Sequence, residues 1–404
     1  MIRRALFLLC VLASPASAQD STVTLWTREI LNSSRLNEQR SIYVATPEGY
    51  RAGTNRYPVL VILDASDRPQ FNLAIANVAF LGNRGAIPNL IVVGIPNGKD
   101  RTHDLTPIAI GALAKDFPTA GGARAFSDFI VDEVLPLVRA KYRTLPGVIL
   151  AGHSFGGLVA LEVAANRPGA FAGVIAMSPA LWWNESSGVV AYSDAIARAT
   201  KRQRLFVTSG GLEADIDKPT VLLSRRLDSL KPAYTAFGHQ RYPEATHGLT
   251  PAPSLVDGLR FIFEPISVAK LPISTLGPGT DSATAMNAFL ESKRRYALGA
   301  HDFGLDERFP EMATNQFGYG VLQALKNPAF AVWAFRQNVE LYPESANVYD
   351  SLGDGLLAMG DTAAAIPQFR RAVDVAVRTN HPVLAESMRK LNALEESRGK
   401  TKRQ

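Results

Sequence analysis

The stretch GVILAGHSFGGLVALEVA, Gly147 to Ala164, contains a change of pattern that decides the fold. Its first part, VILA, is an uninterrupted apolar run typical of a strand covered on both faces, whereas LVALEVA has the spacing of a helix. Between them Gly152-His153-Ser154-Phe155-Gly156 matches the pattern G-x-S-x-G. A serine in so tight a turn takes a strained backbone conformation, and Gly152 and Gly156 leave room for it. The pattern predicts a nucleophile elbow, with the Ser154 hydroxyl at a helix N-terminus that favours developing negative charge.

The N-terminal residues have the layout of a secretory leader. Residues 1–18 contain a positively charged start, an apolar run from Ala5 to Ala13 and a small-residue cleavage signal ending at Ala18. The apolar run is too short to cross a bilayer. We expect cleavage after Ala18, in preference to a lipoprotein modified at Cys10, and hence a secreted or periplasmic protein.

The remaining composition excludes several classes of function. Cys10 is the only cysteine and lies in the leader, so disulfides, cysteine-ligated metals and cysteine catalysis are excluded from the mature chain. The formal net charge of +6 is not gathered into a basic stripe interleaved with aromatic residues, which argues against nucleic-acid binding. No later apolar run approaches the length of a membrane span. No H-E-x-x-H, P-loop or dinucleotide fingerprint is present, so we expect no metal and no cofactor.

Strand and helix patterns alternate over residues 19–265. Strands are predicted at 22–26, 41–45, 58–63, 90–95, 148–152, 173–177, 205–209 and 234–238, and helices at about 70–80, 123–141, 155–166, 219–230 and 254–263. Half-alternating strands followed by fully apolar ones predict a mostly parallel sheet with an antiparallel edge and helices on both faces. This α/β plan resembles the α/β-hydrolase fold, and Ser154 follows its fifth predicted strand.

A linker at residues 266–280 separates this domain from a helical region at residues 281–404. The linker has no hydrophobic period and is rich in Pro, Gly, Ser and Thr. Beyond it, Ala331 and Phe335 recur as Ala365 and Phe369, a spacing of 34 residues that resembles the tetratricopeptide repeat. Fewer than three good repeats cannot bury their faces alone, so we expect this region to dock on the first domain, with residues 383–396 as its closing helix.

A serine hydroxyl needs a base to take its proton and an acid to orient that base, and in an α/β-hydrolase the chain order is serine, acid, histidine. Of the histidines downstream of Ser154, His247 lies in a loop just before the last predicted helix of the domain, where the fold delivers its base. The acid should follow the strand at 205–209. Glu213 is nearest to that strand end and follows two glycines, and Asp215 is the alternative. We therefore predict Ser154, Glu213 and His247 as the catalytic residues.

Hydrolysis of an acyl bond also needs donors for the oxyanion. One is the backbone N–H of Phe155, and the other comes from the loop after the strand at 58–63, where Ala65 and Ser66 are the candidates. The paired tryptophans of this domain either wall an acyl or aryl pocket or divide between the core and the sheet edge. Arg101 either lines the cleft or ties down its own loop. The predicted substrate-binding residues are Trp182, Trp183, Arg101 and His153.

Together these motifs resemble the α/β-hydrolase family that contains siderophore (enterochelin-type) esterases, feruloyl esterases, S-formylglutathione hydrolase and mycolyltransferases. The resemblance is carried by YPVLVILDAS (57–66), the segment 87–107, the elbow, SPALWW (178–183), GGLE (210–213) and ATHG (245–248). It implies an exported serine esterase that acts through an acyl-enzyme on small-molecule carboxylic esters, of the siderophore-lactone or aryl (feruloyl) type. Some siderophore esterases of this family have a Ser-His pair without the acid, which leaves the role of Glu213 open.

Two alternatives to hydrolysis remain. The same fold and nucleophile serve acyltransferases, in which an alcohol replaces water as the acceptor. A protein-interaction scaffold is the other, in which the helical repeats bind a protein partner in their concave face.

Overall fold

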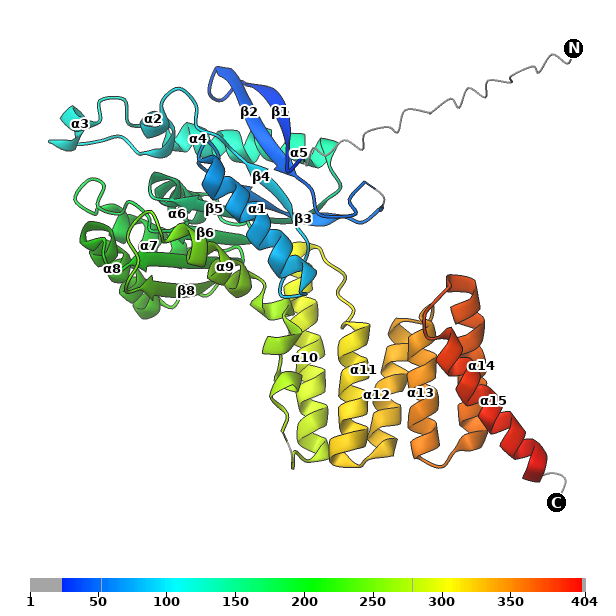
Figure 1. The fold of residues 1–404 in the computed structure, drawn as a ribbon. Helices are drawn as coiled ribbons and strands as arrows, with labels where there is room; N and C mark the ends of the chain where they lie inside the picture. Colours follow the sequence, from blue (N-terminus) through cyan, green and yellow to red (C-terminus); the bar gives the residue numbers. More distant parts are fainter. Residues whose placement is uncertain (1–23, 52, 278, 402–404) are drawn as a thin grey trace, which may run out of the picture.

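The computed structural model describes residues 24–51, 53–277 and 279–401. Figure 1 shows an α/β part followed by a row of helices that extends away from it, ending in α15. The predicted leader at residues 1–18 lies outside the described residues. Within the described residues, no helix combines the length and the apolar character needed to cross a bilayer.

An eight-stranded sheet forms the centre of the α/β part, in the spatial order β1-β2-β4-β3-β5-β6-β7-β8. The pairs β1–β2 and β2–β4 are antiparallel and all other neighbours are parallel, which confirms the predicted mostly parallel sheet with an antiparallel edge. The strands are β1 (Thr27–Ser33), β2 (Glu38–Ala45), β3 (Tyr57–Ile62), β4 (Ile91–Gly94), β5 (Thr144–His153), β6 (Gly173–Met177), β7 (Gln203–Gly210) and β8 (Thr235–Tyr242).

The prediction of the first strand was wrong. The described residues 24–26 are not in a strand, and β1 begins at Thr27, where pairing with Val44 of β2 starts. Because β1 lies at the sheet edge and most of its residues are exposed or half-buried, its polar sequence TREILNS lacks the apolar pattern of a buried strand. The apolar Trp26 just before it packs instead on Tyr43, with ring centroids 4.6 Å apart.

Helices cover both faces of the sheet, as expected for this fold. The helices α1 and α9 pack on one face, and α4 to α8 contribute to the core on the other. A single π-helical turn, η1, joins α4 to α5. The helices are α1 (Arg68–Asn83), α2 (Arg101–Leu105), α3 (Leu113–Asp116), α4 (Ala123–Phe129), η1 (Ile130–Val134), α5 (Leu135–Lys141), α6 (Phe155–Asn166), α7 (Gly188–Ala197), α8 (Ala214–Leu230) and α9 (Pro251–Ile262).

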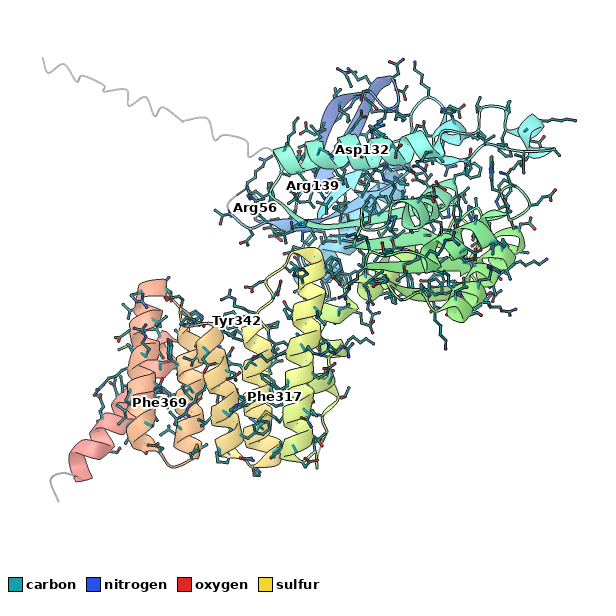
Figure 2. All side chains as sticks on the ribbon, turned by 180° about the vertical axis from the view of Figure 1, so that it is seen from behind. Arg56, Asp132, Arg139, Phe317, Tyr342 and Phe369 are labelled. Carbon is teal, nitrogen blue, oxygen red and sulfur yellow. The ribbon has the colours of Figure 1, made fainter. Side chains whose placement is uncertain are left out.

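The segment predicted as a linker contains short 3₁₀ turns, and the described residues after it form helices joined by loops, with no strand. The turns are η2 (Glu264–Ile266), η3 (Val268–Lys270) and η4 (Pro272–Thr275), and they are followed by α10 (Ser282–Phe303), α11 (Glu311–Gly320), η5 (Val321–Leu325), α12 (Pro328–Leu341), α13 (Ala346–Ala358), α14 (Thr362–Thr379) and α15 (Leu384–Thr401). Figure 2 shows Phe317 and Phe369 within this helical array, where they belong to one buried apolar cluster.

The helical region docks on the α/β part through the end of α10. Phe303 is buried in the apolar cluster beneath the sheet and its ring centroid lies 4.6 Å from that of Phe263. Gly147, at the start of the apolar run in β5, lies so close that an added Cβ would be 2.6 Å from Phe303 Cα. The α/β part and the helical array therefore share one core at this junction.

Candidate active site

The turn between β5 and α6 has the geometry of a nucleophile elbow. Ser154 has φ 61° and ψ −118°, a conformation that costs energy for any residue other than glycine. A Cβ added to Gly152 would collide with the backbone of Gly156, and one added to Gly156 would lie 3.0 Å from Asp64 Oδ2. Both glycines are therefore required by close packing around the turn, as the sequence pattern predicts. Ser154 itself is only partly buried.

Glu213 and His247 form a hydrogen-bonded pair in the loops that follow β7 and β8. The distance from His247 Nδ1 to Glu213 Oε2 is 2.5 Å. The other carboxylate oxygen of Glu213 accepts the Ser178 hydroxyl at 2.5 Å and the Gly210 N–H. Burial raises the pKa of Glu213, but these hydrogen bonds outweigh it and hold the pKa below its ordinary value. The carboxylate is therefore ionised at neutral pH and fixes the His247 proton on Nδ1.

The structure brings His247 next to the elbow. The Nε2 atom of His153, the residue before Ser154, lies 3.0 Å from the backbone oxygen of His247, and the two imidazole rings have centroids 4.3 Å apart. The Nε2 atom of His247 has no hydrogen-bond partner among the described residues, so it is the nitrogen available to take a proton. Asp215, the alternative acid, is exposed at the start of α8, and the described structure has no hydrogen bond or ion pair between it and His247.

The candidate oxyanion donors differ in whether their backbone N–H groups are already hydrogen-bonded. The N–H of Phe155 lies at the first position of α6, where no intrahelical acceptor exists. The Ala65 N–H donates to the Ile95 carbonyl at 3.0 Å, so Ala65 cannot donate to an oxyanion, and its prediction as a donor is corrected. The Ser66 N–H has no partner within the described residues, while the Ser66 hydroxyl accepts the N–H of Asn97 at 2.9 Å. Phe155 and Ser66 therefore remain as the two candidate donors.

An ion pair between Arg101 and Asp64 lies next to the elbow. Arg101 donates to both oxygens of Asp64, at 2.6 Å from Nε and 2.9 Å from Nη2. Asp64 is buried and has φ 58°, directly before the Ala65-Ser66 turn. The Arg101 guanidinium also lies 5.2 Å from the centroid of the Phe155 ring. Of the two roles considered for Arg101, the contacts therefore show it tying loops together.

The predicted tryptophan pair belongs to an aromatic cluster beside the nucleophile. Trp183 is buried and Trp182 is half-buried, and the Phe155 ring contacts both, at centroid distances of 5.5 and 6.0 Å. Phe117, from the loop after α3, packs on Phe155 and on both tryptophans. Trp183 is therefore a core residue, as one of the two interpretations expects, whereas Trp182 keeps an accessible face.

Three side chains at this site were not assigned a role from the sequence. Ser178 binds Glu213, the Thr250 hydroxyl donates to the His247 backbone oxygen at 3.0 Å, and Asp64 binds Arg101. Ser178 also has a positive φ of 42°, which the sequence cannot show. The only sequence signal was their position at or after strand ends, where the loops of this fold meet.

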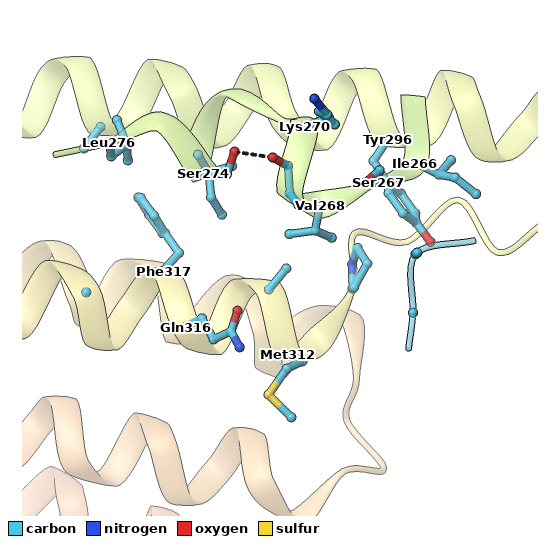
Figure 3. A pocket seen from close by; sticks show the side chains of 18 of the residues that line it. Ile266, Ser267, Val268, Lys270, Ser274, Leu276, Tyr296, Met312, Gln316 and Phe317 are labelled. Carbon is cyan, nitrogen blue, oxygen red and sulfur yellow. Dashed lines mark hydrogen bonds between the residues drawn. The ribbon is translucent and has the colours of Figure 1, made fainter. Parts of the chain in front are cut away.

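A large cavity lies elsewhere, at the junction of the α/β part and the helical array. Its volume is about 1260 Å³, and its walls are mainly apolar residues of the η3–η4 turns, α10 and α11. Figure 3 shows Val268, Leu276 and Phe317 facing it, with Met312 near its edge. None of its lining residues belongs to the elbow or to the Glu213–His247 pair. Across the described residues no group of three or more metal-ligating side chains is gathered in one place.

Comparison with known proteins gives the family. Residues 33–236 match the family model described as "Putative esterase". The chain is 30% identical over 208 residues to a ferri-bacillibactin esterase of Bacillus subtilis, covering 46% of this chain and 70% of that protein. It is 38% identical over 109 residues to a siderophore triacetylfusarinine C esterase of Aspergillus fumigatus, and this match spans 24% of the chain and only 34% of that relative's length.

Solved structures extend the likeness beyond the α/β part. An IroE-like serine hydrolase from Shewanella oneidensis has a TM-score of 0.61 at 25% identity, covering 78% of this chain and 99% of that one. An uncharacterised protein from Capnocytophaga ochracea has a TM-score of 0.67 at 16% identity and covers 92% of this chain and 99% of that one, which shows a shared fold alone. The arrangement of α/β part and helices is therefore found in other proteins.

Proposed function

Because the chain belongs to this esterase family, we propose that it hydrolyses carboxylic esters with Ser154 as nucleophile, His247 as general base and Glu213 as the carboxylate that orients His247. The observation that carries the assignment is the 2.5 Å contact of His247 with Glu213 in a loop hydrogen-bonded to the residue before Ser154. A base held by an acid beside an elbow serine is the arrangement that acyl transfer requires.

In the proposed acylation step, Ser154 Oγ attacks the ester carbonyl while His247 Nε2 accepts the hydroxyl proton. The tetrahedral oxyanion receives hydrogen bonds from the N–H groups of Phe155 and Ser66, and removal of one such donor typically costs about 10²–10³ in rate. Collapse of the intermediate breaks the ester C–O bond, and the proton on His247 passes to the leaving alkoxide. The alcohol leaves and the acyl group remains on Ser154.

Deacylation repeats the sequence with water as the nucleophile. His247 takes a proton from water, the hydroxide adds to the acyl carbonyl, and Ser154 leaves with the proton returned by His247. The carboxylate of Glu213 stabilises the imidazolium that forms in each half-reaction and keeps the Nδ1 proton in place. One ester and one water give one carboxylic acid and one alcohol.

The test is hydrolysis of p-nitrophenyl acetate and butyrate by the purified protein, together with labelling by a fluorophosphonate probe. We expect turnover by the wild type, a loss of at least about 10³-fold in Ser154→Ala, and a single adduct on the peptide containing Ser154. Equal rates for wild type and Ser154→Ala, or an adduct at another residue, would refute the assignment.

For the natural substrate we propose a siderophore ester. The support is that two relatives are siderophore esterases, one for ferri-bacillibactin and one for triacetylfusarinine C. A half-exposed Trp182 next to Phe155 also suits an aryl acyl group, which makes feruloyl-type esters the second candidate. Comparison of kcat/KM on a catecholate trilactone, a hydroxamate siderophore ester and a feruloyl sugar ester separates the two, and a preference for the feruloyl ester would overturn the first.

Export and the helical region are further parts of the proposal. The leader pattern at residues 1–18 supports cleavage after Ala18, and the N-terminal sequence of the mature protein in an exporting host tests it.

The recurring contact of a glycine in one helix with a phenylalanine in the next supports an internal repeat in the helical array. This contact joins Gly318 to Phe335 and Gly353 to Phe369. A partner-binding role for this array predicts specific retention of a protein by the full chain that is lost when α11–α14 surface residues are changed.

A further inference from the structure

The residue before the nucleophile contacts the loop that carries the general base. We propose that His153 is a positioning residue, which holds the His247 loop against the elbow through the hydrogen bond from its Nε2–H to the His247 backbone oxygen. The inference rests on the proposed function, because the hydrogen bond of His153 affects catalysis only if His247 acts on Ser154. It replaces the earlier assignment of His153 to substrate binding.

The chemistry of the contact fixes the state of His153. A backbone oxygen can only accept a hydrogen bond, so the proton must be on Nε2, at 3.0 Å from the His247 oxygen. A neutral His153 with this tautomer has an unprotonated Nδ1. Its ring lies against that of His247 in a tilted arrangement, with a centroid distance of 4.3 Å and an interplanar angle of 35°. One side chain therefore restrains both the backbone and the ring plane of His247.

Burial is the main reason that His153 stays in this neutral state. Burial, followed by the proximity of His247, lowers the pKa of His153 to about 4, and the carboxylates of Asp64 and Glu213 oppose this shift. These three groups are the titratable neighbours that face the ring, and Asp64 is in turn neutralised by Arg101. Because His153 is neutral at physiological pH, it presents no second positive charge when His247 accepts the serine proton.

The loop that carries His247 needs such a restraint. Most side chains from Arg241 to Leu249 are exposed, so the loop gains little from apolar burial. Its other tethers are the Glu213–His247 contact, side-chain bonds of Arg241 and Tyr242 to α8 and α9, backbone contacts to Gly211 and Leu212, and the Thr250 hydroxyl on the same His247 oxygen. None of these partners belongs to β5. His153 is thus the side chain that connects this loop directly to the strand bearing Ser154. A displacement of the base by about 1 Å can cost about 10²-fold in rate, so the connection has catalytic consequences.

Two substitutions separate the hydrogen bond from the ring. His153→Phe keeps an aromatic ring against His247 but removes the donor, whereas His153→Gln places an amide N–H the same number of bonds from Cβ as the lost Nε2–H. Turnover of p-nitrophenyl acetate should fall about 10- to 100-fold in kcat for His153→Phe, with KM changed less than about threefold, and Gln should restore most of the loss. The exposed Glu244→Gln in the same loop is the matched control and should stay near wild type.

Amide hydrogen exchange of the loop gives a readout independent of turnover. We expect faster exchange across residues 243–250 in His153→Phe than in wild type or His153→Gln, with exchange of β5 unchanged, which also shows whether the variant is folded. A kcat for His153→Phe within twofold of wild type, or equal losses in Phe and Gln variants with unchanged exchange, would overturn the inference while leaving the Ser154 assignment intact. An inactive wild type that does not react with the fluorophosphonate would instead overturn the proposed function.

Discussion

Replacement of Glu213 by glutamine tests the candidate site most directly, because the two carboxylate oxygens have different demands. One oxygen accepts from His247 Nδ1, and the other accepts from the Ser178 hydroxyl and the Gly210 N–H. Glutamine offers one acceptor oxygen and one NH₂ donor. Whichever way the new amide is turned in Glu213→Gln, its NH₂ group faces a position that already holds a donor. That donor must then lose its hydrogen bond, or, in the case of His247, move its proton to the other ring nitrogen.

The magnitude follows from comparing the two amide orientations. With NH₂ toward Gly210, a buried backbone N–H loses its acceptor, which costs about 1–3 kcal/mol. With NH₂ toward His247, the imidazole only has to move its proton from Nδ1 to Nε2. The second arrangement is therefore favoured, and it leaves Nε2 unable to accept the Ser154 proton. The changed tautomer of His247 and the loss of the negative charge beside the imidazolium both slow the reaction. We expect kcat to fall by about 10²–10⁴, equivalent to about 3–5 kcal/mol at 1.36 kcal/mol per tenfold.

The assay is steady-state hydrolysis of p-nitrophenyl butyrate, with circular dichroism to show that Glu213→Gln is folded. KM should change little, since the Glu213 side chain is buried and its proposed role is to hold His247. Asp215→Asn is the matched control, because Asp215 is exposed and does not contact His247, and its kcat should stay within twofold of wild type. A Glu213→Gln enzyme that retains more than a third of wild-type kcat would contradict the tautomer argument and identify the site as a Ser-His pair.

Three further outcomes follow from the packing and the titrating groups. Gly152→Ala places a methyl group against the Gly156 backbone, so unfolding in urea should show a loss of about 2–3 kcal/mol, and an unchanged midpoint would contradict the packing of the elbow. Phe303→Ala opens a cavity beside Phe263 at the junction and should lower the free energy of unfolding by about 3–5 kcal/mol in the same measurement. A loss of less than about 1 kcal/mol would show that the helical array is loosely attached. The pKa of His153 is about 4 in the folded chain and near its ordinary value of 6.5 when unfolded, so the unfolded state binds more protons between these values. Stability should therefore fall by about 2 kcal/mol from pH 7 to pH 5 in the wild type relative to His153→Gln, and parallel pH profiles for the two proteins would show that His153 is not desolvated.

The elbow and the sheet could be predicted from sequence because their causes are local. A buried parallel strand must be apolar, and the Gly-x-Ser-x-Gly turn needs hydrogen side chains at fixed positions, so both leave a pattern in a few consecutive residues. The helix α7 is absent from the predicted helices although it has a local signal. Its buried residues Val189, Tyr192, Ser193 and Ile196 follow the helical spacing, although the strand-like VV and the flanking serines obscure it.

Other features depend on contacts between distant segments and could not be read from one stretch. The N–H of Ala65 is occupied because β3 and β4 lie in a register that brings the Ile95 carbonyl to it, and neither sequence shows that register. The edge strand β1 is defined by pairing with β2 more than by its own composition. Ser178 is marked in the sequence by its motif and by its position after a strand, but neither shows its contact with Glu213, which follows the neighbouring strand.

The Asp64–Arg101 pair illustrates how such distant contacts prepare a catalytic group. Asp64 precedes the turn that carries the Ser66 N–H and has a positive φ, so its position must be imposed by the surroundings. Arg101 holds Asp64 in this position by donating to both carboxylate oxygens. Because the guanidinium is planar, the two hydrogen bonds allow little rotation of the Asp64 carboxylate. An oxyanion donor is effective only when it is already aimed before charge develops, since reorientation during the reaction would consume the stabilisation it provides. Because the charge of Arg101 is balanced by Asp64, we expect Arg101 to affect the proposed reaction mainly through the placement of Ser66.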